Sequence, residues 1–342
     1  MKSKTLLNVV KNRFIDHFPF RVLHLITSKC NCRCKICDAW KKSPDYKNDL
    51  STEEIFLMLE DVKNTGISFY TAMGGEPLIR KDLPVVLQYA KKLGLITDVV
   101  TNGFYLKERY NEILPYTDVL AVSIDSNDEL HDEMRGVDGI RSRAIEGIKL
   151  CKNKQTKIII NSIITNANLN KIEGLLKLSK ELDVSISFQP MDIYKEYNEK
   201  FNPTEEELQK AFSNIIDYKK KGYPIVNSFK YLQNFSNKKQ YICHGPKCFI
   251  NIESNGNISS CLNVHDKNWG NIKKIKLIDV FNSKEFRDFC KQVERCNVCN
   301  VSCAIESSIA YSLDPKFLFD KFFSYYFSYY NPLLKNRKRK NH

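Results

Sequence analysis

The sequence predicts an α/β fold in which strand-like and helix-like runs alternate six times, followed by a smaller cysteine-rich part. Three observations lead to this prediction. Short aliphatic runs alternate with longer amphipathic runs between residues 22 and 221, hydrophobic residues make up 42% of the chain, and cysteines return where the alternation stops after Gly222. Parallel strands joined by helices can form a barrel, part of a barrel or a doubly wound sheet. The residues alone leave these architectures open.

The six predicted strands cover residues 22–27, 67–73, 96–101, 119–124, 158–164 and 184–189. Ser51-Thr-Glu-Glu54 is a capping signal for a first helix that carries Ile55 and Val62 on its apolar side. Further helices are expected near residues 82–93, 106–114, 140–153, 168–182 and 204–221. In the cysteine-rich part, two short apolar runs flank a tight-turn signal at Asn255-Gly256, which predicts a β-hairpin. We expect this small extension to consist of the hairpin and a helix.

Composition and charge exclude some classes of protein and leave others open. The chain of 342 residues has no apolar run of transmembrane length and no secretory leader, so its twelve cysteines indicate thiols kept in a reducing interior. We therefore expect a cytoplasmic protein. The formal charge of +13 favours nucleic acid, an anionic membrane surface or an acidic substrate as partner, but solvated lysine-rich faces explain it equally well.

Directly after the first predicted strand, Cys30, Cys34 and Cys37 occur in the spacing C-x3-C-x2-C. Three thiolates can hold three irons of a [4Fe–4S] cube and leave the fourth iron open to another ligand. Half of a zinc site, a disulfide knot and a buried helix face with i, i+4, i+7 spacing are the alternatives. The polar residues between the cysteines favour a ligand loop over a helix face.

Four more short motifs lie at or just after predicted strand ends. They are Gly74-Gly-Glu-Pro77, Thr101-Asn-Gly103, Ser123-Ile-Asp125 and His131-Asp-Glu-Met-Arg-Gly136. With the cysteine triplet, this order of motifs resembles the radical S-adenosylmethionine (SAM) enzymes over residues of about 20 to 190, and a second cysteine-rich part extends the resemblance to about 310. The resemblance implies a partial (β/α)6 TIM-like barrel whose C-terminal mouth holds a [4Fe–4S] cluster that binds SAM.

The resemblance also implies roles for individual residues. Cys30, Cys34 and Cys37 would ligate the cluster. The residues expected to contact SAM are Gly74, Gly75 and Glu76 at its amino group, Ser123 and Asp125 at the ribose, and Arg135 at its carboxylate. His131 would hold its loop without a catalytic role, and Asn161 would either line the nucleotide pocket or be a satisfied buried amide.

Three positions depart from the pattern of the family. Ile36 stands where many members carry an aromatic residue, and an apolar side chain there can still shield the cluster. Cys32 is an extra thiol inside the loop and is expected not to be a ligand. Ser126 replaces the usual glycine after Ser-Ile-Asp, which makes the role of Asp125 less secure than that of Ser123.

A second group of cysteines follows residue 222. The pattern Gly256-x4-Cys261, Gly270-Asn-Ile272 and Cys296-x2-Cys299-x3-Cys303 resembles the auxiliary-cluster extension called SPASM or, when shortened, twitch. Because the x5 step of the longer version is missing, we expect one auxiliary [4Fe–4S] cluster. Its expected ligands are Cys243, Cys261, Cys296 and Cys299, with Cys248 and Cys303 as alternates. A zinc site with four cysteine ligands would use the same residues.

Some cysteines and neighbours are expected to have no part in this site. Cys290 and Cys151 lie outside the pattern and are expected to be core thiols. Leu262 stands where sulfatase-maturing relatives carry an aspartate, which disfavours that activity.

The chain is expected to divide into four parts: an N-terminal amphipathic helix (1–20), the partial barrel (21–222), the auxiliary-cluster domain (223–310), and an aromatic helix with a basic tail (311–342). The aromatic run 317–330 and the basic run 335–340 suit an anionic membrane interface or stacking on single-stranded nucleic acid. A helix that covers the barrel, followed by a solvated tail, explains them as well.

We therefore expect a radical SAM enzyme that reductively cleaves SAM to a 5′-deoxyadenosyl radical and abstracts hydrogen from a peptide, protein or small-metabolite substrate. Its expected partner is a one-electron reductant such as flavodoxin or ferredoxin. An RNA-modifying enzyme on the same barrel is an alternative that the charge of +13 favours, although nucleic acid is the less favoured partner. A zinc-stabilised binding module without SAM chemistry is the other alternative.

Overall fold

The computed structural model describes residues 11–151, 155–192, 197–237, 241–261, 265 and 267–312, and of residues 42–45 it describes only the backbone. Several predictions concern residues outside these ranges: residues 1–10 of the N-terminal helix, Leu262, the aromatic run 317–330 and the basic run 335–340. The described part of the N-terminal segment contains a short π-helix, Asn12–Asp16, which ends at His17.

The centre of the molecule is one sheet of nine strands in the order β6-β5-β4-β3-β2-β1-β7-β8-β9. The strands are β1 (Arg21–Thr27), β2 (Phe69–Gly74), β3 (Ile96–Thr101), β4 (Val119–Ser123), β5 (Lys157–Ile164), β6 (Ser185–Pro190), β7 (Phe249–Ile252), β8 (Asn257–Ser260) and β9 (Lys267–Asn271). The first six pair in sequence order and all in parallel. In this order β6 does not pair with β1, so the sheet is an unclosed barrel, which confirms the predicted fold class.

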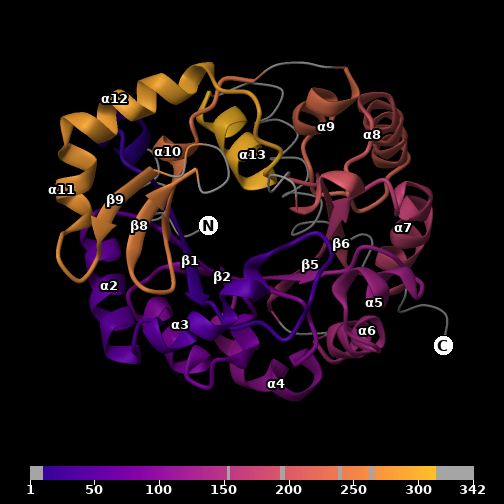
Figure 1. Ribbon diagram of the computed structural model, residues 1–342, viewed down its shortest axis with the longest axis horizontal. Coiled ribbons are helices and arrows are strands. Elements are labelled where there is room, and N and C mark those ends of the chain that lie inside the picture. The colour runs from indigo at the N-terminus through magenta and orange to yellow at the C-terminus, as the bar shows by residue number, and fades with distance from the viewer. Residues whose placement is uncertain are drawn as a thin grey trace, which may run out of the picture.

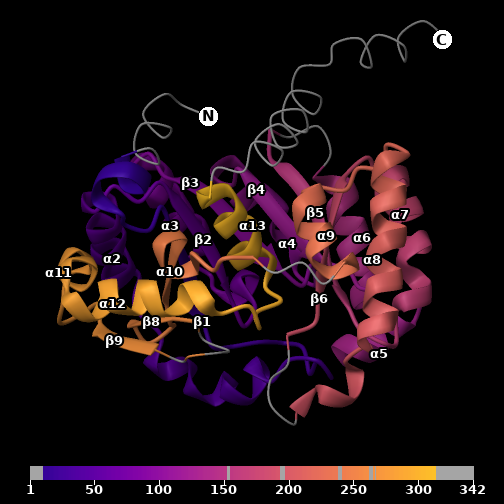
Figure 2. The same cartoon turned by 90° about the horizontal axis from the view of Figure 1, so that it is seen from above.

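Helices follow the strands on the outside of the curved sheet (Figure 1). They are α2 (Thr52–Asn64), α3 (Leu83–Lys92), α4 (Leu106–Ile113), α5 (Leu130–Arg135), α6 (Ile140–Leu150), α7 (Ile172–Glu181), α8 (Glu205–Lys220), α9 (Phe229–Ser236), α10 (Gly245–Cys248), α11 (Leu277–Asn282), α12 (Lys284–Gln292) and α13 (Ser302–Tyr311). In Figure 2 the helices α6, α7 and α8 lie outside β5 and β6. The six strand boundaries agree with the predicted ones to within two residues. None of the helices in the described ranges combines the length and the hydropathy needed to cross a membrane.

The two faces of the parallel sheet differ in burial. Along β5, Ile158, Ile160 and Ile164 are buried toward the helices, whereas Ile159 and Asn161 on the other face are partly exposed. β3, β4 and β6 show the same alternation. The interior of a closed (β/α)8 barrel is filled by side chains. In this unclosed sheet the inner face therefore keeps room for a ligand.

The cysteine-rich part continues the same sheet. β7 pairs in parallel with β1, from Arg21↔Phe249 to His24↔Ile252, and β8 returns antiparallel to β7. The predicted hairpin is confirmed, and Gly256 in its turn has a φ of +89° that only glycine adopts readily. The sequence predicted one helix for this part, whereas the structure has several, among them α11 and α12, and it adds the strand β9.

Helix α13 lies across the open side of the sheet, between α9 and α10 (Figure 1). At one end the backbone N–H of Ser302 donates to the side-chain oxygen of Gln189 on β6 (2.8 Å). At the other end the backbone N–H of His244 donates to the hydroxyl of Ser308 (2.8 Å). α13 therefore links β6, at one edge of the sheet, to the residues just before α10 and β7.

Ser51 gives a direct test of the first helix after the cysteine loop. Its hydroxyl accepts from the backbone N–H of Glu54, and the Glu54 carboxylate accepts from the backbone N–H of Ser51, so the predicted capping box is confirmed. We expect Ser51→Ala to lower the free energy of unfolding by about 1 kcal/mol, because an N–H of the first turn loses its partner. Urea unfolding followed by circular dichroism measures this loss. Ser51→Thr keeps a capping hydroxyl and is the matched control; equal losses in both variants would contradict the role of the cap.

Candidate functional site

The cysteine loop follows β1 and is held by the backbone of α5. The N–H of Arg33 donates to the carbonyl of Arg135 (3.0 Å), and the N–H of Lys35 donates to the carbonyl of Met134 (2.9 Å). At Gly136, which ends α5 with a φ of +63°, a Cβ atom would lie 2.7 Å from the carbonyl oxygen of Arg33. The motif from His131 to Gly136 therefore supports the cysteine loop directly.

Residues beyond β6 hold the same loop from another side. The hydroxyl of Tyr197 donates to the carbonyl of Cys34 (2.9 Å), and the side-chain amide of Asn198 donates to the carbonyl of Ile36 (3.1 Å). Neither contact could be foreseen from the sequence, because no local motif marks residues 197 and 198.

The two glycines after β2 lie against the backbone of the cysteine loop. The N–H of Gly75 donates to the carbonyl of Thr27, and the N–H of Glu76 donates to the carbonyl of Lys29, both at 2.8 Å. A Cβ atom on Gly75 would lie 2.2 Å from the carbonyl oxygen of Lys29, and one on Gly74 would lie 2.8 Å from that of Thr27. Only glycine fits at either position.

Four thiols gather in the loop. Cys32 shares hydrogen bonds with Cys30 and Cys34, and these lower the pKa of Cys30 and bring the pKa of Cys34 to about 6. The same hydrogen bonds, together with burial, raise the pKa of Cys32. Burial raises the pKa of Cys37 to about 11. Cys32 therefore lies between Cys30 and Cys34 and is hydrogen-bonded to both thiols.

The groups around the thiols fit an iron–sulfur cluster. Asn31 Nδ2 and Trp40 Nε1 are buried donors with no hydrogen-bond partner among the described residues. The backbone N–H of Ala39 lies 3.5 Å from the sulfur of Cys37. Such donors are typical neighbours of cluster sulfurs, whose hydrogen bonds adjust the reduction potential. Three cysteine ligands and these donors suit a [4Fe–4S] cluster that leaves one iron without a thiolate.

Glu76 joins the ends of β2 and β3. Its carboxylate accepts from the N–H of Leu78 (3.0 Å), the hydroxyl of Thr101 (2.6 Å) and the N–H of Asn102 (2.7 Å). Burial raises the pKa of Glu76, and these three hydrogen bonds act against the rise. Glu76 is only 1% exposed, and its carboxylate hydrogen-bonds to other groups of the protein.

Asn102 carries this network on to the cysteine loop. Its Nδ2 donates to Asn31 Oδ1 (2.9 Å) and lies 3.2 Å from the sulfur of Cys32. In the sequence, Thr101-Asn-Gly103 was one of the motifs that carry the resemblance, with no role assigned to Asn102 itself. The structure makes Asn102 the link between Glu76 and the loop, a role that no property of the tripeptide alone indicates.

Asp125 and Arg135 form a buried ion pair after β4. The guanidinium donates through Nε and Nη2 to Asp125 Oδ2 at 2.8 and 2.7 Å, and the backbone N–H of Ile163 donates to Oδ1 (2.9 Å). Burial alone would lower the pKa of Arg135, but Asp125 and the thiol of Cys34 raise it. The guanidinium in turn lowers the pKa of Cys34. Arg135 therefore places a permanent positive charge beside the loop.

The other residues that the sequence singled out at the ends of β4 and β5 lie close to the ion pair of Asp125 and Arg135. His131 is fully buried, burial lowers its pKa to about 4, and its Nδ1 accepts from the N–H of Asp125 (3.0 Å). Ser123 ends β4, is partly exposed, and pairs in register with Asn161. Asn161 accepts from the hydroxyl of Ser187 (2.8 Å), so it is hydrogen-bonded and also faces the inner side of the sheet.

The second cysteine group comes together from three separate segments. Cys243, Cys261 and Cys296 pack in one cluster with Phe289 and Val293. Cys299 lies nearby, where its carbonyl accepts from the hydroxyl of Tyr241 (3.3 Å). Burial raises the pKa of Cys261 to about 12 and also raises the pKa values of Cys243 and Cys299. Ligation of a metal or cluster must therefore displace protons from this site.

The remaining cysteines have different surroundings. Cys248 is fully buried and its thiol donates to the carbonyl of Ser307 (3.5 Å). Burial raises the pKa of Cys303 to about 11, against the charge of nearby Arg21. Cys290 and Cys151 are buried, as expected of core thiols. All twelve cysteines are free thiols, which answers the disulfide alternative. Across the described ranges, no three cysteine, histidine, aspartate or glutamate side chains are close enough together to hold a single metal ion.

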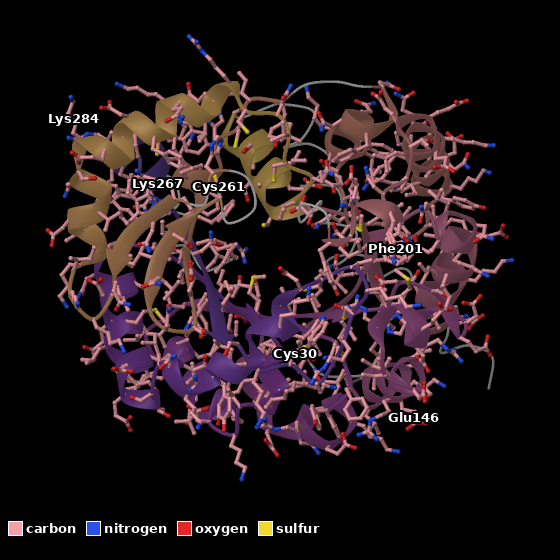
Figure 3. The ribbon with its side chains drawn as sticks, in the orientation of Figure 1. Cys30, Glu146, Phe201, Cys261, Lys267 and Lys284 are labelled. Carbon is pink, nitrogen blue, oxygen red and sulfur yellow. The ribbon has the colours of Figure 1, made fainter. Side chains whose placement is uncertain are left out.

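The two cysteine groups lie toward opposite ends of the strands. Cys30 follows the carboxyl end of β1. Cys261 follows β8, which runs antiparallel to β7 and therefore ends beside the amino end of β1. Figure 3 shows Cys30 and Cys261 in separate parts of the molecule. The inner face of the sheet extends between these two ends.

Gly75 offers a test of how the cysteine loop is held. We expect Gly75→Ala to displace the loop, because the new methyl group would collide with the carbonyl of Lys29, and to lower the iron bound per chain severalfold. Gly174→Ala is the matched control, since the nearest atom to its Cβ is 4.0 Å away. Iron assay and visible absorption after anaerobic reconstitution report the outcome. Full iron content in Gly75→Ala would show that the loop tolerates the shift.

Comparison with known families agrees with this geometry. Residues 25–179 match the model of the Radical SAM superfamily, and residues 186–318 match a domain of unknown function, DUF3463. The Fe-coproporphyrin III synthase of Methanosarcina barkeri is 30% identical over 158 residues, which are 46% of this chain and 40% of the relative. The GTP 3′,8-cyclase of Campylobacter jejuni is 30% identical over 185 residues, 51% of this chain and 57% of the relative. The chain thus spans only about half the length of these curated relatives.

Two solved structures share the fold. Streptococcus suis SuiB, bound to its precursor peptide SuiA, aligns with a TM-score of 0.67 at 19% identity, over 83% of this chain and 69% of SuiB. The enzyme anSMEcpe with bound AdoMet aligns with a TM-score of 0.64 at 17% identity, over 88% of this chain and 98% of that one. At such identities the likeness concerns the fold alone. The chain therefore contains a radical SAM domain over residues 25–179, which includes the cysteine loop and the strands β2 to β5.

Proposed function

We propose that the chain cleaves SAM reductively at a [4Fe–4S] cluster and abstracts hydrogen from a substrate on the inner face of the sheet. The bound cluster and SAM would supply the one-electron cleavage that yields methionine and a 5′-deoxyadenosyl radical. The observation that carries the proposal is the loop of Cys30, Cys34 and Cys37 at the mouth of an inner face whose side chains are only partly buried.

The residues of the chain would bind and orient these cofactors. Cys30, Cys34 and Cys37 would ligate three irons, with Asn31 and Trp40 as donors to cluster sulfurs. The segment Gly74, Gly75 and Glu76, together with Ser123, Asp125 and Arg135, would form the SAM pocket. Glu76, Gly74 and Gly75 would contribute to the SAM pocket mainly by positioning the backbone. The hydrogen bonds of Glu76 and the close approaches of both glycines are all with other parts of the protein.

The proposed substrate is a peptide, a protein or a small metabolite that reaches the inner face. Polar groups available there include Ser123, Asn161 and Ser187 on adjacent strands. The names of the relatives support either class: SuiB binds the peptide SuiA, whereas the two curated relatives are a synthase of Fe-coproporphyrin III and a cyclase of GTP. Arg135 is paired with Asp125, so its positive charge is already partly compensated.

We also propose one auxiliary [4Fe–4S] cluster, ligated by Cys243, Cys261, Cys296 and Cys299. The packing of three of these around Phe289 and the position of Cys299 beside Tyr241 support this set. Cys248 is less suited, because its thiol is directed to the carbonyl of Ser307. The division of the chain into parts at residues 222 and 310, and its cytoplasmic location, stay predictions.

Purification without oxygen tests the proposal. We expect protein that contains iron and sulfide rather than zinc and that forms 5′-deoxyadenosine from SAM when dithionite is added. Liquid chromatography of the products measures the yield. A colourless, zinc-loaded protein that leaves SAM intact would instead support a zinc-stabilised module.

Cys34 and Cys32 form a matched pair of variants. We expect Cys34→Ala to lower 5′-deoxyadenosine formation by at least about a thousandfold, because the cluster loses one of three protein ligands. Cys32→Ala should keep the cluster, since Cys32 lies outside the C-x3-C-x2-C spacing of the three expected ligands. Iron content and low-temperature EPR of the reduced proteins distinguish the two. If only Cys32→Ala lost the cluster, Cys32 would be the ligand and Cys34 would not.

Cys261→Ala tests the auxiliary site separately. We expect this variant to lose about half of the iron, since one of two four-iron clusters lacks a ligand. With dithionite it should still form 5′-deoxyadenosine, because the proposed SAM site lies at the other end of the strands. Cys290→Ala, at a buried thiol outside the ligand set, serves as the control. Undiminished iron in Cys261→Ala would remove Cys261 from the ligand set.

A further inference from the structure

Cations are concentrated on the cysteine loop and the 3-10 helix η2 (Ala39–Asn48) that follows it. Residues 28–48 contain six lysine and arginine residues but only two aspartates. The whole chain of 342 residues carries a formal charge of +13, so this short stretch holds a disproportionate share of it. Lys29, Arg33, Lys41 and Lys47 are exposed, and we call these four residues the basic face.

Aromatic rings hold three of these cations in place. The ammonium of Lys29 lies 4.9 Å from the ring centre of Tyr46, and that of Lys41 lies 4.1 Å from Tyr197. The guanidinium of Arg33 lies 5.3 Å from the ring of Trp40. Contacts of this kind orient a cation while it stays charged and accessible.

Two nearby carboxylates have other partners. Glu133 pairs with Lys35 (2.6 Å), and the carboxylate of Asp49 accepts from Thr27 and Ser28. Within the described ranges, no ion pair involves any residue of the basic face. Its charge is therefore available to an anionic partner.

The basic face and the cluster ligands are two sides of one loop. Arg33 and Lys35 are exposed, whereas Cys32, Cys34 and Ile36 between and beside them are buried. Arg33 Nη1 donates to the carbonyls of Cys30 (3.2 Å) and Cys32 (2.9 Å). A partner on the basic face would therefore stand directly over the backbone of the proposed cluster ligands.

We propose that the basic face is the docking surface for an acidic protein that donates one electron at a time to the cluster. This inference rests on the proposed function, because reductive cleavage of SAM consumes one electron per event. The donor would be oxidised by one electron and the cluster reduced by one. Opposite charges would speed the encounter and orient the donor over the loop.

RNA is the competing partner, because its phosphates would be attracted by the same cations. The position of the face favours an electron donor. Its charges surround the loop that holds the proposed cluster, where reduction is required, whereas the proposed substrate region lies on the inner face of the sheet behind that loop.

The test uses the full chain, reconstituted without oxygen, and the double variant Lys41→Glu/Lys47→Glu. Neither residue belongs to the proposed cluster or SAM site. The matched control is Lys284→Glu on α12, whose side chain is 84% exposed and which lies far from Cys30 in Figure 3. Formation of 5′-deoxyadenosine is measured with reduced flavodoxin, an acidic one-electron carrier, and separately with dithionite, a small reductant that needs no docking surface.

With flavodoxin at low salt, we expect the double variant to lose about tenfold or more in kcat/KM for the donor, and added salt should narrow its difference from the unmodified protein. Lys41→Gln/Lys47→Gln, which removes charge without reversing it, should lose less. With dithionite, all variants should match the unmodified protein, and Lys284→Glu should match it with both reductants. Iron content confirms that each protein carries its clusters.

Each contrary result has a distinct meaning. If the double variant equals the unmodified protein with flavodoxin, the docking surface is refuted and the proposed function stands. If the unmodified protein forms no 5′-deoxyadenosine with dithionite, the proposed function fails and the docking proposal falls with it. If the double variant binds a single-stranded RNA oligonucleotide more weakly but retains its flavodoxin kinetics, the face binds RNA and the proposal is overturned.

Discussion

The site depends on the contact between two backbone segments that are distant in sequence. The cysteine loop after β1 lies so close to the turn after β2 that a single methyl group on Gly75 would overlap the carbonyl of Lys29. Two main-chain hydrogen bonds, from Gly75 and Glu76, join the segments. Because both segments extend from adjacent parallel strands, the sheet sets their separation. The position of every thiol in the loop follows from this contact.

Networks of hydrogen bonds and one ion pair also fix the positions of the other loops at the mouth of the barrel. Glu76 ties β2 to β3 and, through Asn102, to the cysteine loop. Asp125 and Arg135 tie the end of β4 to α5, whose backbone also pairs with the loop. Buried networks of this kind have few alternative arrangements, since breaking one contact leaves a buried polar group unsatisfied. The polar side chains of the mouth are therefore held by contacts within the protein.

The unclosed sheet determines where the two cysteine groups lie. The cysteine-rich part does not form a separate layer, because β7 continues the sheet beside β1 and α13 bridges from β6 to α10. The inner face consequently lies between the two groups. A closed barrel would fill this space with side chains, whereas six parallel strands leave it to a ligand.

The sequence by itself determined the strand–helix alternation, the capping box at Ser51, the hairpin turn at Gly256 and the ligand spacing of the first loop, because each depends on residues close together in the chain. Tertiary structure alone decided the pairing of β7 with β1, the packing of Phe289 and Val293 against Cys243, and the use of Asn102 as a link. These depend on contacts between distant segments, which leave no periodic pattern in the chain. Even Gly75 shows this difference: its motif was visible in the sequence, but the carbonyl that forbids a side chain there comes from another strand.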